Sequence, residues 1–235
     1  MGHPRAGKPS FDPAAFVAGQ GTLYSLSKDG KGSAGPLVTA LTVAVTEAAE
    51  ARATGMAGGR LDVPPLGVLD EAANVCRWPQ LPNLYSHFGS RGIVLMTILQ
   101  SWSQGVEDWG RQGMRKLWSA SNLAAYLGGV REPEFLDELS RLIGQHDIMR
   151  QSVTRSSNGR STSQHIQQER ILDDDELAAL PRGRAILFAS GTPATLIRTN
   201  PWMAGPHAAA VRASIAATDP AAAKRLAPVL EGGVA

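Results

Sequence analysis

The sequence predicts an α/β layer fold with a mostly parallel central sheet. Short apolar segments of strand length alternate along the chain with longer segments in which apolar residues have helical spacing. The strongest apolar segments are continuous rather than alternating, which is typical of strands buried on both faces. The chain has 235 residues, 43% of them hydrophobic and 19% charged, so it can bury the core of one domain.

The first strand is predicted at residues 22–26 and is followed by a glycine-rich loop at 27–35. Pro36 suits the first turn of a helix, in which apolar residues recur every three or four positions until the glycines at 55–59. The run LGVL at 66–69 follows two prolines and precedes two acidic residues, which predicts a buried central strand.

The middle of the chain is predicted to hold two helices and at least two strands. A helix is predicted at 81–88 and another at 103–114. Between them, GIVLMTIL at 92–99 is the most continuous apolar run in the chain, which predicts a strand buried on both faces. Residues 116–127 are predicted to add one or two strand segments.

The last third of the chain begins with an amphipathic helix that is predicted to start after Pro133 and to end at Gly144. Beyond it, the Asn-Gly pair at 158–159 is typical of a hairpin turn, here between polar strands predicted at 153–155 and 162–170. The polar composition of this hairpin predicts that it protrudes from the body of the protein.

Two closing strands are predicted at 185–190 and 195–199, and they are expected to pair. These elements divide the chain into an N-terminal segment (1–21), an α/β domain (22–203) and an alanine-rich tail (204–235). Because the tail has no clear hydrophobic periodicity, we expect it to be a frayed helix or a flexible segment.

Composition limits where the chain works. No apolar run reaches the roughly 18 to 20 residues that a membrane span needs, and the N-terminus has no apolar leader, so we expect a cytoplasmic chain without a membrane anchor of its own. Cys76 is the only cysteine, which excludes an internal disulfide and predicts an inert core thiol. The net charge of +2 is compatible with a nucleic-acid partner but does not require one.

The stretch LGVLDEAAN at 66–74 has the pattern of a Walker B motif, an apolar strand that ends in two carboxylates. At the carboxyl edge of a buried strand, Asp70 could hold Mg²⁺ through water, and Glu71 could polarise the water that attacks a γ-phosphate. As an isolated match the motif is weak, because acidic residues also favour the start of a helix.

The next predicted strand ends in Gln100-Ser101, which would place a carboxamide beside the two acids if the strands are neighbours. Such a glutamine could sense the γ-phosphate or hold the water, although it could equally be a polar residue leaving a strand. Arg91 precedes the same strand and could reach the nucleotide of a neighbouring subunit as an arginine finger. An exposed arginine in a turn is an equally good interpretation of Arg91.

The segment at 70–104, DEAANVCRWPQLPNLYSHFGSRGIVLMTILQSWSQ, resembles the Walker B to glutamine-motif segment of TraG/TraD-type conjugative coupling proteins. The order of an acidic pair, a proline-containing loop, a helix, a basic residue with glycine, an apolar strand and Gln-Ser carries the resemblance. It continues at 122–129 with a later strand, at 134–144 with the helix of the region that contacts relaxosome accessory proteins, and at 180–188 with the closing strand. The resemblance spans roughly residues 11–202.

The resemblance implies a RecA-like P-loop NTPase core that is incomplete at its N-terminal, Walker A side. It also implies a homo-hexameric motor at the cytoplasmic face of the inner membrane, which couples ATP hydrolysis to movement of single-stranded DNA and its relaxase into a type IV secretion channel. TraM-type accessory proteins would be further partners. In such a motor Asp70 would bind Mg²⁺ and ATP, Gln100 would contact ATP, and Glu71, Gln100 and Arg91 would serve catalysis.

Two departures from the family pattern affect this interpretation. Family members carry transmembrane helices and a Walker A loop before the matching segment, and neither is recognisable in this sequence. GHPRAGKP at 2–9 places Pro9 where Ser or Thr must bind Mg²⁺, and the glycines at 30–33 have the wrong spacing. In addition, Gly89 stands where many members have a basic residue. We therefore expect little ATPase activity from this chain alone.

Three hypotheses follow for function. The chain could be the Walker B half of a coupling ATPase, a non-catalytic truncated relative that binds DNA or protein partners, or part of an FtsK/HerA-like DNA translocase. Neighbouring cations and tryptophans could offer stacking platforms to single-stranded DNA, although tryptophans at such positions more often belong to the core. These candidate DNA contacts are Arg77, Trp78, Trp102, Trp109, Arg111, Arg115 and Lys116.

Overall fold

The computed structural model describes residues 10–27, 32–156 and 159–219, with the backbone alone for 151–156 and 159–163. Its helices, in chain order, are α1 (Pro13–Ala18), α2 (Gly35–Thr54), η1 (Ala57–Gly59), α3 (Ala72–Val75), α4 (Leu81–Arg91), α5 (Trp102–Ala120), α6 (Pro133–Ile143), α7 (Asp174–Ala178), η2 (Trp202–Ala204) and α8 (Ala208–Thr218). Its strands are β1 (Leu66–Leu69), β2 (Val94–Thr97), β3 (Leu123–Tyr126), β4 (Gln145–Ser156), β5 (Gly159–Arg170), β6 (Arg184–Ala189) and β7 (Thr195–Arg198).

Helices and strands are both present, as predicted, but the described strands form three small sheets rather than one mostly parallel sheet. Strands β1 and β2 are parallel, β3, β6 and β7 form an antiparallel sheet in the order β3-β6-β7, and β4 and β5 form a hairpin. The prediction of a mostly parallel sheet is therefore correct only for β1 and β2. Short connections join β4 to β5 and β6 to β7, which favours antiparallel pairing, whereas β3 and β6 pair across the segment that holds α6, the hairpin and α7.

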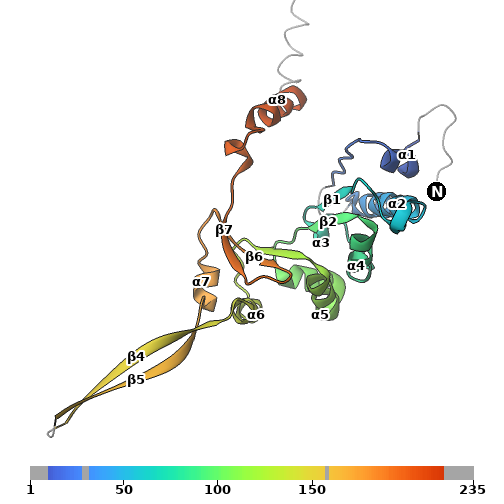
Figure 1. Ribbon diagram of the computed structural model, residues 1–235. Coiled ribbons are helices and arrows are strands. Elements are labelled where there is room, and N and C mark those ends of the chain that lie inside the picture. Colours follow the sequence, from blue (N-terminus) through green and yellow to red (C-terminus); the bar gives the residue numbers. More distant parts are fainter. Residues whose placement is uncertain (1–9, 28–31, 157–158, 220–235) are drawn as a thin grey trace, which may run out of the picture.

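The first hydrophobic cluster lies between helices α2 to α5 and one face of the β1–β2 pair (Figure 1). Leu69 from β1 and Phe88 from α4 are buried in it, and Leu95 from β2 packs against it. Cys76 is also buried there, and burial raises the pKa of its thiol, which makes the reactive thiolate rarer.

The opposite face of the β1–β2 pair is exposed. In the register of the two strands, Leu66 lies opposite Val94 and Val68 opposite Met96, so these four side chains share one face. They are 61%, 47%, 53% and 50% exposed, respectively. The prediction that both strands are buried on two faces is thus wrong for the chain by itself, because only the helix-covered face is buried.

The second hydrophobic cluster joins the antiparallel sheet to α6 and α7. Leu139 from α6, Leu177 from α7 and Ile186 from β6 are almost completely buried in it. The hydroxyl of Tyr126 donates a hydrogen bond of 3.0 Å to the carbonyl oxygen of Leu177, which satisfies the polar end of a buried side chain. The pairing of β6 with β7 confirms the predicted closing strands.

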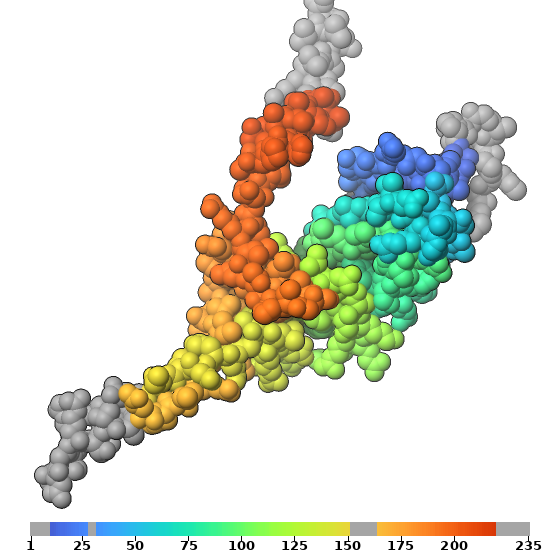
Figure 2. Space-filling view, viewed as in Figure 1, coloured from blue at the N-terminus to red at the C-terminus, as the bar shows by residue number. Residues whose placement is uncertain are grey.

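The β4–β5 hairpin extends away from the rest of the protein (Figures 1 and 2). Its base is tied to α6 and α7 by Arg170, whose guanidinium lies 2.6 Å from Asp137 and 3.0 Å from Asp174. These carboxylates raise the pKa of Arg170 further above its ordinary value. The predicted protrusion is confirmed, but β4 begins at Gln145, well before 153–155. The predicted turn includes Asn158, which lies outside the described residues.

Two further sequence-based assignments are corrected by the structure. Residues 22–26 form no strand, and the described part of the loop that follows them leads directly into α2. Residues 116–120 are helical and belong to the second part of α5, whose two parts meet at a kink at Gly110 (φ 69°, ψ 165°). Helical packing of Leu117 in the first cluster outweighs the local strand signal. None of the described helices is long and apolar enough to span a membrane.

Candidate functional site

The candidate site lies where the parallel strands β1 and β2 end. Beyond their register, the amide of Ile98 donates to the carbonyl oxygen of Leu69 at 3.0 Å, and the amide of Ala72 donates to the carbonyl oxygen of Ile98 at 3.1 Å. These two bonds hold the segments that follow the strands together. The pairing therefore brings Asp70, Glu71 and Gln100 to one edge of the sheet, as the sequence predicted.

Glu71 has an unusual backbone that directs its side chain toward the second strand. It is the only described residue other than glycine with a positive φ, at φ 48° and ψ 47°, and it immediately precedes α3. Its Oε1 accepts a hydrogen bond of 2.8 Å from Nε2 of Gln100. The left-handed conformation costs a residue with a Cβ about 1 kcal/mol or more, so this turn is held by its surroundings.

Asp70 directly follows β1, next to Glu71, and is exposed. Among the described residues no ion pair or hydrogen bond involves its carboxylate, and no group of three or more His, Cys, Asp or Glu side chains could by itself enclose a metal ion. A hydrated Mg²⁺ needs only one or two protein carboxylates because it retains several waters. Asp70 therefore fits a site for magnesium that is bound together with a phosphate ligand.

Gln104, in the first turn of α5, holds Gln100 in place. Its Oε1 accepts from the backbone amide of Gln100 at 3.2 Å, and its Nε2 donates to Oδ1 of Asn74 at 3.0 Å. One carboxamide thus connects the segments that follow β1 and β2. Sequence reasoning had assigned no role to Gln104 or Asn74, and the only available signal was the polar character of both residues next to predicted site residues.

The start of α5 is fixed by hydrogen bonds from two directions. Ser101 accepts from the amide of Gln104 at 3.2 Å as the N-cap of the helix. Glu132, immediately before α6, accepts from both the amide and the hydroxyl of Ser103, at 3.1 Å and 2.8 Å. A carboxylate at a helix N-terminus is favourable for the helix dipole. Glu132 also links the candidate site to α6, which sequence reasoning had not anticipated.

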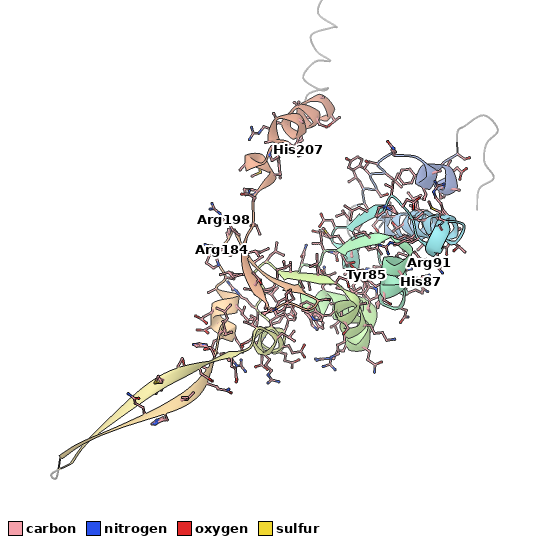
Figure 3. All side chains as sticks on the ribbon, in the orientation of Figure 1. Tyr85, His87, Arg91, Arg184, Arg198 and His207 are labelled. Atoms are coloured by element: carbon pink, nitrogen blue, oxygen red, sulfur yellow. The ribbon has the colours of Figure 1, made fainter. Side chains whose placement is uncertain are left out.

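Arg91 is not brought to this site within the chain. It ends α4 and precedes β2, so it lies near the amino end of the strand pair, whereas Gln100 follows the carboxyl end. Its Nη1 donates to the carbonyl oxygen of Gly59 at 3.1 Å, and its Nε is buried without a hydrogen-bond partner among the described groups. Figure 3 shows Arg91 with Tyr85 and His87 on α4, away from the antiparallel sheet.

The tryptophans that the sequence offers as stacking platforms for DNA bases belong mainly to the core. Trp78 is 3% exposed, and its carbonyl oxygen accepts from Nε1 of Trp109 at 2.9 Å. Trp102 stacks on Phe135 with ring centroids 5.2 Å apart. These rings are already occupied by protein groups, so stacking with bases would require them to leave the core.

The cationic side chains that the sequence offers as DNA contacts have ion-pair or hydrogen-bond partners within the protein. Arg77 lies 3.6 Å from Asp108, Arg111 lies 3.2 Å from Glu134, and Arg115 lies 3.7 Å from Glu138. Lys116 donates to Asn83 at 3.1 Å. The Arg111 and Arg115 pairs connect α5 to α6, and the contact between Ser103 and Glu132 likewise joins the start of α5 to the start of α6.

Comparison with protein families supports the sequence resemblance. The family described as "TraM recognition site of TraD and TraG" matches residues 64–182, just over half of the chain. This chain belongs to that family. The matched region begins before β1, contains the candidate site, α6 and the β4–β5 hairpin, and ends before β6.

Solved structures of the bacterial conjugative coupling protein TrwB have a similar fold. An unbound form is 22% identical with a TM-score of 0.53, and complexes with the ATP analogue ADPNP and with ADP and Mg²⁺ are each 21% identical with TM-scores of 0.52. Each match covers 71% of this chain but only 37% to 38% of the TrwB chain. The family member described here therefore spans less than two-fifths of that length. No curated protein matches the chain.

Proposed function

We propose that the chain is the Walker B half of a conjugative coupling ATPase, which acts with a phosphate-binding loop to couple ATP hydrolysis to the transport of single-stranded DNA. The observation that carries the proposal is the hydrogen bond of 2.8 Å between Gln100 and Glu71, beside the exposed Asp70. Two carboxylates and a carboxamide at the carboxyl edge of neighbouring parallel strands suit the hydrolysis of a nucleoside triphosphate.

Each residue has a role that follows from its position. Mg²⁺ would neutralise phosphate charge when bound with ATP, and Asp70 would hold its water shell. Glu71 would orient the attacking water and accept hydrogen bonds from it. Gln100, which donates to Glu71, would respond to the γ-phosphate by exchanging this donor between the carboxylate and a phosphate oxygen. Arg91 would act, if at all, on a nucleotide held by a neighbouring subunit.

The proposal requires a phosphate-binding loop that is not recognisable in the described residues. Among the described residues no strand precedes α2, so the strand–loop–helix order of a Walker A motif is not seen in that part of the chain. The exposed apolar face of β1 and β2 supports the docking of a further α/β layer, since parallel strands are normally covered on both faces. A homo-hexamer at the cytoplasmic face of the inner membrane would be the complete motor.

The partners proposed for this motor are single-stranded DNA with its relaxase, relaxosome accessory proteins and components of the secretion channel. The family match, which is named for TraM recognition, supports the accessory proteins in particular. It also favours a coupling protein over an FtsK/HerA-like translocase. Within the chain we assign residues 22–203 to the ATPase part, with 1–21 and 204–235 as flanking segments.

A second candidate function is a non-catalytic module that binds DNA or protein partners. Two observations favour it: Arg91 donates to Gly59, and no described strand precedes α2. The groups that would bind phosphates are thus not assembled among the described residues. Under this alternative the Glu71–Gln100 contact would stabilise the turns after the strands and do no chemistry.

Equilibrium binding of a fluorescent ATP analogue with Mg²⁺ distinguishes the two candidates. The chain is mixed with an excess of a polypeptide that supplies the P-loop region of a family member, and binding is compared for the unchanged chain, Asp70→Ala and Glu71→Gln. The proposal expects weaker Mg²⁺-dependent binding with Asp70→Ala, and retained binding but lost turnover with Glu71→Gln. If neither substitution changed nucleotide binding or ATP turnover, the proposal would be contradicted and the non-catalytic module favoured.

A further inference from the structure

Two arginines lie directly opposite each other on neighbouring strands of the antiparallel sheet. Arg184 of β6 pairs in register with Arg198 of β7, and both side chains are exposed (Figure 3). The amide of Thr199 donates to the carbonyl oxygen of Gly183 at 2.9 Å, so the adjoining Arg184–Arg198 pair is of the non-hydrogen-bonded type, in which opposite side chains come closest.

This arrangement is unfavourable for the isolated chain. Like charges directly opposite on a sheet destabilise it, and neither arginine forms an ion pair with any described acidic group. A charge on an edge strand can prevent aggregation, which would explain Arg198. It does not explain Arg184, because β6 is the middle strand of the sheet. Arg182, also exposed, adds a third positive charge two residues earlier.

The backbone beside this pair is free to bind another strand. Strand β7 pairs only with β6 among the described strands. Because hydrogen-bonded pairs alternate along an antiparallel ladder, the amides and carbonyls of Leu196 and Arg198 point away from β6. The two side chains share one face of the sheet, and that of Leu196 is 54% exposed.

We propose that the free edge of β7 binds an extended acidic segment of a partner protein, which adds a strand to the sheet. A carboxylate of the added strand would lie near Arg198 and Arg184, and an apolar side chain two positions away would cover Leu196. A nucleic acid could use the arginines but not the free amides, carbonyls and apolar side chain of β7, so the combination favours a peptide. This surface is separate from the nucleotide site and does not depend on the proposed function.

The test uses the full chain, without nucleotide, and a fluorescein-labelled peptide of about ten residues. In this peptide glutamate and valine alternate on one face of the extended strand, and threonine occupies every other position. We expect saturable binding by fluorescence anisotropy, and Arg184→Glu and Arg198→Glu should each weaken it about tenfold or more. The matched control is Arg212→Glu on α8. Arg212 is exposed and donates to the carbonyl oxygen of Met203, and its substitution should leave affinity unchanged.

Two further arms separate this proposal from a folding defect and from simple charge attraction. The double variant Arg184→Glu with Arg198→Glu should bind a peptide in which lysine replaces glutamate, which shows that the altered sheet is still folded. A glutamate peptide with N-methylated backbone amides should lose binding. The proposal would be overturned if the methylated peptide bound as tightly as the unmethylated one, or if Arg212→Glu weakened binding as much as the substitutions at Arg184 and Arg198. It would also be overturned if single-stranded oligo-dT bound more tightly than the peptide and depended on Arg184 and Arg198.

Discussion

The two packed units of the protein differ in how completely they are covered. The first unit, β1 and β2 with α2 to α5, buries one face of a parallel pair and leaves the other apolar face exposed. The second unit, β3, β6 and β7 with α6 and α7, is antiparallel and buries its core around Leu139 and Leu177. Antiparallel sheets commonly have one solvated face, whereas parallel sheets are normally covered on both. The second unit therefore has the one-sided burial usual for its sheet type, whereas the first leaves exposed an apolar face that parallel sheets normally bury.

The largest expected effect tests the buried core of the second unit. Leu139 is 1% exposed, so Leu139→Ala should lower the free energy of unfolding by about 2–5 kcal/mol through lost burial and a cavity. Leu142 lies on the same helix but is 57% exposed, and Leu142→Ala should change stability by less than about 0.5 kcal/mol. Urea unfolding of both variants measures the difference, and similar losses for the two would show that α6 is not packed as described.

A second prediction concerns the strained turn in the first unit. Glycine adopts positive φ without a Cβ penalty, so Glu71→Gly should raise the free energy of unfolding by about 1 kcal/mol, less the value of one exposed hydrogen bond to Gln100. The same change at the adjacent Asp70, whose φ is not positive, should give no such gain. Urea unfolding checks both, and a loss of stability in Glu71→Gly would mean that the turn is not strained.

A third prediction sharpens the contrast between the two faces of β1. Val68 is 53% exposed, so Val68→Lys should change stability by less than about 0.5 kcal/mol. It should also reduce binding of an apolar dye and self-association, because it interrupts an exposed apolar face. Leu69 is 7% exposed, and Leu69→Lys should strongly destabilise the fold because it buries an unpaired charge. Tolerance of lysine at both positions would contradict the one-sided packing of the strand.

The smallest expected effect is a pH dependence from α5 in the first unit. Burial raises the pKa of Asp108, partly offset by Arg77, and Oδ2 has no hydrogen-bond partner among the described groups. The folded pKa thus lies above the unfolded value of about 3.9, so the contribution of Asp108 to stability is present below that pH and is lost as pH rises through the folded pKa.

The substitution Asp108→Asn should therefore gain stability relative to the unchanged chain when urea unfolding is repeated from pH about 4 to pH about 7. An exposed acid on another helix provides the control, since Glu47→Gln on α2 should not reproduce this trend. If the difference in free energy of unfolding between Asp108→Asn and the unchanged chain did not vary with pH, Asp108 would be excluded as the source of the pH dependence.

The candidate site was more predictable than the sheet around it. Asp70, Glu71 and Gln100 follow apolar runs directly, and the parallel pairing of two such runs is enough to bring them together. Gln104 and Glu132 were missed because they bind Asn74 and Ser103, which lie 30 and 29 residues away, and spacing in the sequence carries no signal for such contacts.

Errors in the predicted fold have physical reasons as well. Residues 22–26 have the composition of a strand but pair with no described strand, and pairing rather than composition makes a strand. The first half of β4 was missed because it is mostly polar, with Ile148 and Met149 adjacent rather than alternating, and strands that project from the body need no apolar face. The exposure of Val68 and Met96 could not be predicted, because the sequence of an apolar strand is the same whether one or both of its faces are covered in the structure.

Because the β4–β5 hairpin is long and is anchored at its base, a small rotation at the base produces a large displacement at its far end. Each strand has 12 residues, which corresponds to about 40 Å of extended chain. Arg170 fixes this arm to α6, and Glu132 fixes the start of α6 to the start of α5, one turn from Gln100. A rotation of α6 by about 5° would displace the far end of an arm of that length by about 3 Å. Small adjustments beside Gln100 would thus be magnified at a distance, with no need for the body of the protein to deform.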